Sequence, residues 1–339
     1  MTSAWKSCLS GILLALICVR AVLAYSDPEI EKLLSSLSDP YCPSLEDYRL
    51  IENYYQFGER PYIDQIRKDS HIQGAELDYR IQQLRNFKLV GPNGEMPIRE
   101  VHALNVTEET KDRCILIYAS YNAHYPQRAR RLLQELKERG YSGHVILRVG
   151  GFPNISNRGA KLCTIPYTFR LAFFHEALEM GFTKILYLDA TLHPLNDLST
   201  LFSDIDQYGY FSCHMSKGWF DDCFAGHAKF LGIPFEQKAQ IPWVLGYATG
   251  LDFTNEKTRK LFEAWEDYMH RIDEFCFIGD DIVFTCLIWS FNFPQPYPFD
   301  KTIAVSDFEP APGSFSNSML FYMDCHKTVI REGWGSLYD

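Results

Sequence analysis

Polar residues follow three apolar runs of the sequence, at the points where buried strands are expected to end. Ser120-Tyr121-Asn122 follows the run 114–119, Gly150-Gly151 follows the run 144–149, and Asp189-Ala190-Thr191 ends and follows the run 184–189. In an open α/β sheet, ligands bind outside the carboxyl ends of the strands. We therefore expect these three groups of residues to line one ligand site.

The elements that must position these residues alternate between apolar runs and amphipathic segments. The runs at 114–119, 144–149 and 184–189 are typical of buried strands, and segments 127–138 and 167–180 repeat apolar residues at helical spacing. This alternation predicts a largely parallel, three-layer α/β/α sheet with right-handed crossovers. Later strands are expected at 209–213 and 245–253, and later helices at 256–274 and 280–291.

The chain divides into three predicted parts. Residues 1–24 contain a basic residue, a short apolar core and a small-residue end, which is typical of a cleaved signal peptide; an N-terminal anchor is the alternative. Residues 25–112 are predicted to be a mainly helical region with a turn at 91–94 and a short extended stretch after it. The α/β domain is predicted to cover residues 113–339.

Composition and motifs exclude several classes of protein. The net charge is -10, and no stretch concentrates Lys and Arg into a stripe, so a nucleic-acid partner is not expected. No G-x-G-x-x-G follows the first predicted strand and no G-x-x-x-x-G-K-[ST] occurs, which argues against a dinucleotide fold and a P-loop. Eight cysteines remain beyond residue 24, and an exported chain with that number is expected to form at least one disulfide.

The segment from Lys184 to Leu198 resembles the GT-A glycosyltransferases, which are nucleotide-diphosphosugar transferases. It reads Lys-Ile-Leu-Tyr-Leu-Asp-Ala-Thr-Leu-His-Pro-Leu-Asn-Asp-Leu, and it stands with a strand starting at 114 and a later strand containing Gly246 and Gly250. The resemblance covers roughly residues 113 to 330. It implies a Rossmann-like GT-A fold and a donor with a nucleoside diphosphate leaving group.

The sequence departs from that family at its metal-binding D-x-D motif, because the second acid is replaced by Thr191. The resemblance implies Mn²⁺ or Mg²⁺ bound by Asp189, with Thr191 and the donor diphosphate nearby and His326 as a late ligand. The alternatives are that Asp189 only caps the turn after its strand and that His326 is an ordinary surface histidine.

The resemblance also assigns donor-binding roles. Ser120, Tyr121 and Asn122 would line the nucleotide pocket, although Ser and Asn are also ordinary βα-turn residues. Arg170 would neutralise the diphosphate, with a surface arginine as the alternative. Arg128 is the candidate ligand contact from the run 128–131, for which a solvated helix face is the alternative.

The resemblance implies a catalytic role for the acids at the start of the last predicted helix. Asp280 and Asp281 follow Gly279 and resemble the late acidic motif that orients or deprotonates the acceptor. An inverting transferase needs a carboxylate base, and Asp281 is preferred with Asp280 as substitute. The competing explanation is a helix cap, because Asp is favoured at helix N-termini.

The predicted signal peptide and the GT-A resemblance together imply an exported glycosyltransferase that moves a sugar from a nucleotide-diphosphosugar to the hydroxyl of a glycan, protein or lipid. The rival hypothesis is a non-catalytic secreted protein that binds a nucleotide sugar or glycan and retains the fold without metal catalysis. The fold alone does not decide between them, because function belongs to the site. Convergence of Asp189, Arg170, Asp281 and His326 beside Tyr121 is the geometry that the enzyme requires.

Overall fold

The structure is a computed structural model that describes residues 89–121, 125–151, 169–214, 232–234, 236–237, 241, 244–270, 280–294, 297–298, 303–306 and 321–324. The predicted signal peptide, the predicted helices before residue 89, Asn122 and His326 lie outside the described residues.

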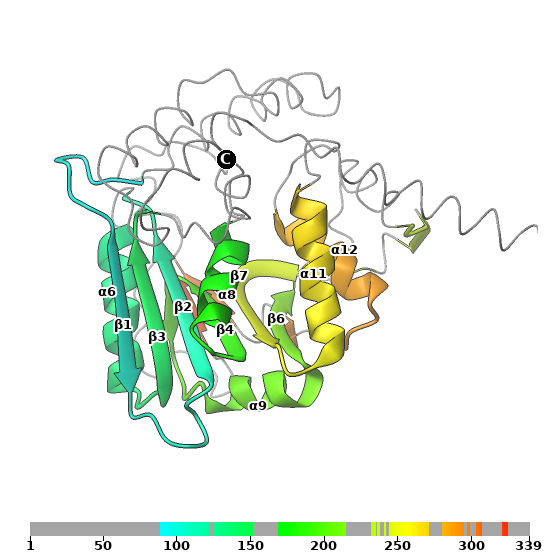
Figure 1. Cartoon of the computed structure of the whole chain (residues 1–339), viewed down its shortest axis with the longest axis horizontal. Coiled ribbons are helices and arrows are strands. Elements are labelled where there is room, and N and C mark those ends of the chain that lie inside the picture. Colours follow the sequence, from blue (N-terminus) through cyan, green and yellow to red (C-terminus); the bar gives the residue numbers. More distant parts are fainter. Residues whose placement is uncertain are drawn as a thin grey trace, which may run out of the picture.

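The described strands and helices alternate from residue 113 to residue 189, as the sequence pattern predicts (Figure 1). In order they are β1 (Ile98–Leu104), β2 (Arg113–Ala119), α6 (Tyr125–Glu138), β3 (Gly143–Val149), α8 (Phe169–Glu179), β4 (Lys184–Asp189), β5 (Leu192–Pro194), α9 (Ser199–Tyr208), β6 (Tyr210–His214), β7 (Val244–Asp252), α11 (Glu256–His270), α12 (Asp280–Ser290), β8 (Tyr297–Pro298), β9 (Ile303–Ser306) and β10 (Phe321–Asp324).

The main sheet has seven strands in the order β1-β3-β2-β4-β7-β6-β8. Strands β3, β2 and β4 are parallel neighbours, and β6 and β8 run in the same direction. Strands β1 and β7 run the opposite way, paired with β3 and with β4 and β6 respectively. The predicted mostly parallel sheet is therefore confirmed, with two antiparallel strands in it.

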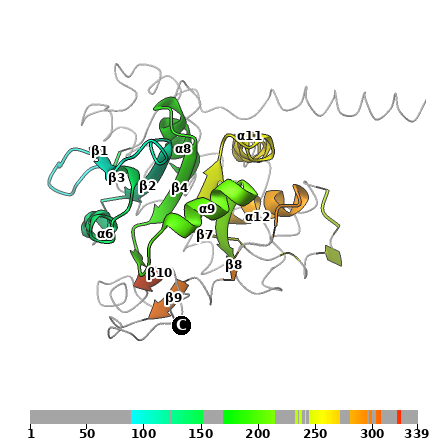
Figure 2. The same ribbon diagram turned by 90° about the horizontal axis from the view of Figure 1, so that it is seen from below.

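Helices cover both faces of this sheet because its central strands are apolar on both sides. Buried residues of α8, α11 and α12 pack with one set of strand side chains, including Leu116 and Tyr187. Buried residues of α6 and α9 pack with the alternate set, including Ile117 and Leu188. Figure 2 shows α6 and α8 on opposite sides of the strands. The predicted three-layer α/β/α architecture is confirmed.

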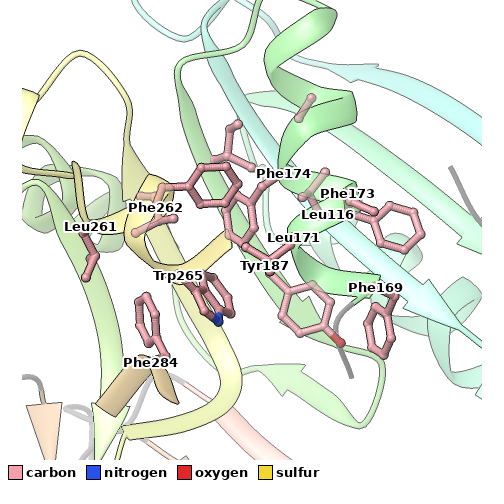
Figure 3. Close-up of a cluster of buried hydrophobic side chains, with 14 of the residues drawn as sticks. Leu116, Phe169, Leu171, Phe173, Phe174, Tyr187, Leu261, Phe262, Trp265 and Phe284 are labelled. Carbon is pink, nitrogen blue, oxygen red and sulfur yellow. The ribbon is translucent and has the colours of Figure 1, made fainter. Parts of the chain in front are cut away.

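An aromatic cluster fixes α8 and α11 against the sheet (Figure 3). Phe174 of α8 lies 6.4 Å from Trp265 of α11, and Trp265 lies 4.6 Å from Phe284 of α12, measured between ring centroids. At the other end of α8, the ring of Phe169 lies 4.5 Å from that of Tyr118 in β2. Offset and edge contacts of this kind add to the burial of apolar area. The first turn of α8 is thereby held beside the ends of β2 and β4.

A buried ion network adds a second link between α8 and the sheet. Arg148 of β3 is 1% exposed and donates two hydrogen bonds of 2.8 Å to the two carboxylate oxygens of Glu176 in α8, which is 0% exposed. Arg99 of β1 donates to the same carboxylate. The carboxylate therefore lies between two guanidinium groups.

A smaller sheet of three strands has the order β5-β10-β9. Strand β10 pairs antiparallel with β5, so that Met323 lies opposite Leu192, and parallel with β9. Short strands such as these give little local signal in a sequence. The sequence pattern did not predict this sheet.

Strand β1 begins before the predicted domain boundary at residue 112, within the stretch that was predicted to belong to the N-terminal region. All seven of its residues pair with β3, from Ile98 opposite Val149 to Leu104 opposite Gly143. The stretch is extended, as predicted, but it is an edge strand of the main sheet. The predicted helical region stays a prediction for residues 25–88.

Three of the cysteines are in the described residues. Cys114, Cys213 and Cys286 are buried with reduced thiols, and burial raises the pKa of the Cys114 and Cys286 thiols. The predicted disulfide stays a prediction for the remaining cysteines, which lie outside the described residues. No helix in the described part of the chain is long and apolar enough to cross a bilayer.

Candidate active site

The carboxyl ends of β2, β3 and β4 lie at one edge of the main sheet because these strands are parallel. The chain leaves β2 for β3 on one side and then crosses back to β4 on the other. Such a reversal of strand order makes a crevice at the carboxyl edge, where ligands of open α/β sheets bind. Tyr118 of β2 is paired with Asp189 of β4 at this point. We call the residues around it the carboxyl-edge site.

Asp189 ends β4 and forms the turn that follows. Its Oδ1 accepts hydrogen bonds from the backbone N–H of Thr191 (2.9 Å) and from the Thr191 hydroxyl (2.6 Å). Asp189 is half-buried, and Thr191 is 8% exposed. Among the described residues, none hydrogen-bonds to the other carboxylate oxygen, Oδ2. The capping role is therefore real, and it leaves one carboxylate oxygen available at the edge.

The chain contains a second turn of the same kind at the opposite edge of the sheet. Asp252, at the end of β7, accepts hydrogen bonds through Oδ1 from the N–H (2.9 Å) and hydroxyl (2.7 Å) of Thr254. It is 5% exposed and pairs with Lys184, the first residue of β4. An Asp-x-Thr turn is thus a structural unit that this sequence also uses away from the carboxyl-edge site.

Tyr121 follows β2 and is held between β3 and the segment before β1. Its hydroxyl donates a 2.6 Å hydrogen bond to the carbonyl of Met96. A Cβ at Gly150 would lie 2.5 Å from the Tyr121 ring and 2.3 Å from the carbonyl of Leu89, and the φ of Gly150 is +67°. Burial and the negative charge of Glu95 raise the pKa of Tyr121. The phenol is therefore neutral at neutral pH, and its ring lies beside the carboxyl ends of β2 and β3.

Arg170 is buried at the start of α8, which contradicts the surface alternative. It is 5% exposed, and its guanidinium carbon lies 5.7 Å from the ring centroid of Tyr187. Tyr187 and Asp189 are alternate residues of β4 and so lie on the same face of the strand. Arg170 also donates a 2.7 Å hydrogen bond to the carbonyl of Gly246 in β7. The predicted cation thus lies on the face of the sheet that carries Asp189.

An irregularity in β7 makes room for this arginine. Ser212 of β6 pairs with Thr249, whereas the next residue, Cys213, pairs with Leu245, so the register shifts within β7. A Cβ at Gly246 would lie 2.0 Å from Nη1 of Arg170, and a Cβ at Gly250 would lie 2.4 Å from Ile205 on the other face. The register shift explains why two glycines four residues apart face opposite layers.

The arginine run of α6 is not a simple solvated face. Arg128 is 7% exposed, and its guanidinium carbon lies 5.7 Å from the ring centroid of Tyr125. Arg130 is exposed and pairs with Glu100 of β1 at 3.2 Å. Arg131 donates hydrogen bonds to backbone carbonyls of the segment after β4. Arg128 lies in the first turn of α6, which begins at the carboxyl edge, as the prediction of a ligand contact requires.

Asp280 and Asp281 open α12, and the topology brings this end of the helix to the carboxyl edge. Thr285 of α12 accepts a hydrogen bond from the N–H of Val244, where β7 begins. Beyond the other end of α12, Pro294 accepts a hydrogen bond from Tyr210, where β6 begins. Strand β7 begins at the carboxyl edge and β6 at the opposite one, so α12 starts on the side of the carboxyl edge and runs toward the opposite edge.

Strand β10 approaches the turn formed by Asp189. Its residue Met323 pairs with Leu192, and Asp324 is the next residue of the strand, toward Thr191. The predicted ligand His326 follows two residues later, outside the described residues. Sequence reasoning did not identify Asp324, because its position beside the turn depends on pairing with β5.

The described residues do not by themselves make a divalent cation site. No group of three or more His, Cys, Asp or Glu side chains suitable for a metal occurs among them. At the carboxyl edge, Asp189 uses one oxygen for the turn, and Thr191 offers a neutral hydroxyl. Hard cations prefer several oxygen ligands. The cation therefore stays a prediction that requires residues beyond those described.

The fold and the site define an α/β/α protein with polar residues at the carboxyl edge of a mostly parallel sheet. Of the predicted residues, those found at this edge are Ser120, Tyr121, Asp189, Thr191 and Arg170. Their elements agree with the architecture that the GT-A resemblance implied.

Three solved structures that are similar to this chain are glycosyltransferases. Mouse xyloside xylosyltransferase 1, in its apo form, gives a TM-score of 0.38 with 11% identity over 57% of this chain and 87% of its own. A glycosyltransferase involved in the glycosylation of the major capsid of PBCV-1 gives 0.39 with 12% identity over 65% and 97%. Galactosyltransferase LgtC, in complex with donor and acceptor sugar analogues, gives 0.38 with 11% identity over 63% and 87%.

No protein-family profile matches the chain, and no curated protein sequence matches it. At the scores and identities of the three structures, likeness assigns no residue its role. The roles proposed below therefore rest on the contacts of this chain's own residues.

Proposed function

We propose that the protein transfers a sugar from a nucleotide-diphosphosugar to an acceptor hydroxyl. The observation that carries this proposal is that a carboxylate and a buried cation occur together where the strand order reverses between β2 and β4. There, Asp189 keeps one carboxylate oxygen available, and the buried cation Arg170 lies on the same face of the sheet. A phosphorylated sugar donor offers both hydroxyls for a carboxylate and negative charge for a guanidinium.

The electrostatics of the edge favour a diphosphate leaving group. Helices α6, α8 and α12 all begin at this edge, and the N-terminal end of a helix carries partial positive charge. Arg170 is oriented by the Gly246 carbonyl, so little side-chain entropy remains to be lost when it binds an anion. In this proposal Arg170 stabilises the charge that develops on the nucleoside diphosphate as the bond to the sugar breaks.

The acceptor side is assigned to the first turn of α12. In an inverting transfer, the acceptor hydroxyl must give its proton to a carboxylate within hydrogen-bond distance. Asp281 is proposed for that role, with Asp280 as the cap of the helix or as the substitute base. The placement of the start of α12 at the carboxyl edge supports this assignment. Ser120 and Tyr121 are proposed to contact the nucleotide from the end of β2.

A panel of nucleotide sugars tests the proposal, with hydrolysis and transfer measured with and without Mn²⁺. We expect at least one donor to be turned over. Comparing turnover with and without Mn²⁺ tests whether the reaction needs a divalent cation. The proposed ligands of that cation are Asp189, Thr191 and His326. Binding of a nucleotide sugar without turnover would contradict the transferase and support the non-catalytic binding protein. The observation that favours this second candidate is the similar Asp-x-Thr turn at Asp252, which lies away from the carboxyl-edge site.

Gly246→Ala is expected to lower the turnover of the donor roughly tenfold, the scale of losing one hydrogen bond to a charged group. The added methyl group would collide with Arg170, whose guanidinium must then leave its position. Steady-state kinetics on folded protein measures the effect.

Gly250→Ala is the matched control because it adds a methyl group to the same strand on the other face, against Ile205. Overpacking there is expected to destabilise the fold by roughly 1–3 kcal/mol without changing the turnover per folded molecule. Equal turnover in Gly246→Ala and wild type would show that Arg170 has no part in the reaction.

A further inference from the structure

We infer that Arg131 is a positioning residue of the carboxyl-edge site, which holds the backbone on both sides of Thr191 and so fixes the turn that presents Asp189. Its effect on turnover rests on the proposed function. Its effect on the turn does not, and the two are measured separately below.

Arg131 contacts the turn from the neighbouring helix α6. Its Nη2 atom donates hydrogen bonds to the carbonyls of Ala190 (3.1 Å) and Leu192 (3.0 Å). Thr191 lies between these two residues, and its own N–H and hydroxyl donate to Oδ1 of Asp189. One guanidinium nitrogen therefore binds the carbonyls of the two residues on either side of Thr191, the residue that donates hydrogen bonds to Asp189.

Arg131 is itself part of a chain of polar contacts. Its Nε lies 3.6 Å from Oε1 of Glu135, one turn later on α6, and the same oxygen lies 2.8 Å from Nδ1 of His193. All three side chains are between 22% and 27% exposed, so solvent screens these contacts less than those of a fully exposed pair. Glu135 thus links the arginine to the first residues of β5 as well.

The contact adds orientation to a segment that apolar burial already places. Ala190 is 1% exposed and Leu192 is 0% exposed, and both pack in the layer of α6 and α9. Their side chains anchor the segment, but an apolar anchor leaves the carbonyls free to rotate. Hydrogen bonds from a rigid guanidinium to two carbonyls restrict that rotation. The function of Arg131 is therefore to fix the direction of Asp189, not to keep the segment attached.

The contacts of Arg131 and Glu135 also reach the strand that precedes His326. His193, which Glu135 holds, is paired with Tyr322 of β10. Arg131, Glu135 and His193 therefore connect α6 with the turn after β4 and with β10. The turn carries Asp189, and β10 is the strand that precedes the proposed ligand His326, so contacts from a single helix reach both segments.

Arg131→Gln and Arg131→Lys test the inference, with Arg139→Gln as the matched control. Arg139 directly follows the last residue of α6 and donates a hydrogen bond of 2.5 Å to the carbonyl of Leu195, beyond β5. The control thus removes the same kind of contact to a backbone carbonyl without touching the turn. Hydrogen exchange of the Thr191 amide reports on the turn without any ligand, and steady-state kinetics reports on the site.

We expect the Thr191 amide to exchange about tenfold faster in Arg131→Gln, because its bond to Asp189 then opens more often. We expect kcat to fall about tenfold, with KM for the donor changed less, because a misplaced carboxylate harms the reaction more than binding. Arg131→Lys should recover part of kcat, since an ammonium group can bond one carbonyl. Arg139→Gln should match wild type in both measurements.

Unchanged exchange of the Thr191 amide in Arg131→Gln would overturn the inference whatever the kinetics show. Faster exchange with wild-type kcat and KM would also overturn it, because the contact would then be structural only. If wild-type protein turns over no nucleotide sugar, the proposed function fails, and the exchange measurement still decides whether Arg131 holds the turn.

Discussion

Asp189→Asn is expected to lower the turnover of the nucleotide sugar about a hundredfold, the scale of losing one preorganised electrostatic contact. Asparagine retains a side-chain oxygen that can accept both hydrogen bonds from Thr191, so the turn is kept while the negative charge is lost. The change therefore distinguishes an Asp189 that only forms the turn from an Asp189 whose negative charge takes part in the reaction. Steady-state kinetics on variant and wild type of matched melting temperature measures the effect.

Asp252→Asn is the internal control for this variant. It makes the same chemical change in the same kind of turn, where Oδ1 of Asp252 bonds Thr254 at the opposite edge of the sheet. It should leave turnover unchanged and affect only stability, through the loss of a negative charge near Lys184. Equal losses of activity in the two variants, or none in Asp189→Asn, would show that Asp189 is only a turn former.

Glu176→Gln is expected to destabilise the fold by roughly 3–5 kcal/mol, the range for breaking a buried ion pair from one side. The change removes the negative charge between Arg148 and Arg99. The positive charge of Arg148, which is 1% exposed, is then buried without a compensating negative charge from Glu176. Urea unfolding followed by circular dichroism measures the difference in the free energy of unfolding.

Glu256→Gln provides the comparison for that stability measurement. Glu256 is 72% exposed and pairs with Lys260 one turn later on α11, at 2.7 Å. Solvent screens such a pair, so the urea midpoint of Glu256→Gln should equal that of wild type. A Glu176→Gln protein as stable as wild type would show that the buried network does not contribute to the stability of α8 on the sheet.

The parallel part of the fold could be predicted because its signals are local. The run 114–119 is apolar at every position and corresponds to β2, and the apolar positions of α6, such as Leu132 and Leu136, are those buried in the structure. The helix predicted at 167–180 was observed at Phe169–Glu179. Each of these elements can be recognised from the composition and the spacing of apolar residues within its own segment.

The features that could not be predicted depend on pairing between distant segments. The sequence of β1 shows extended character but not that it joins β3. The direction of β7 and the register shift that places Gly246 against Arg170 follow from β6 and α8. Arg148 carried a signal that was missed, because a charged residue within an otherwise apolar strand must find a buried partner.

The site was predictable to the extent that it follows from strand ends. Asp189 and Tyr121 were placed at the carboxyl edge because parallel strands end there together. Arg131 was grouped with its neighbours as surface charge, since nothing local distinguishes it from Arg130. Its contacts with Ala190 and Leu192 arise only when α6 packs over the turn.

The arrangement of the small sheet sets an order of events during synthesis. Strand β10 lies between β5 and β9, which are joined only through it, and it is translated after every strand of the main sheet. Domains generally fold as units, with the N-terminal part of the chain emerging first during synthesis. The segment that follows Asp189 therefore receives its partner strand only after residues 321–324 have been translated. A chain interrupted before these residues would lack the strand that pairs with Leu192.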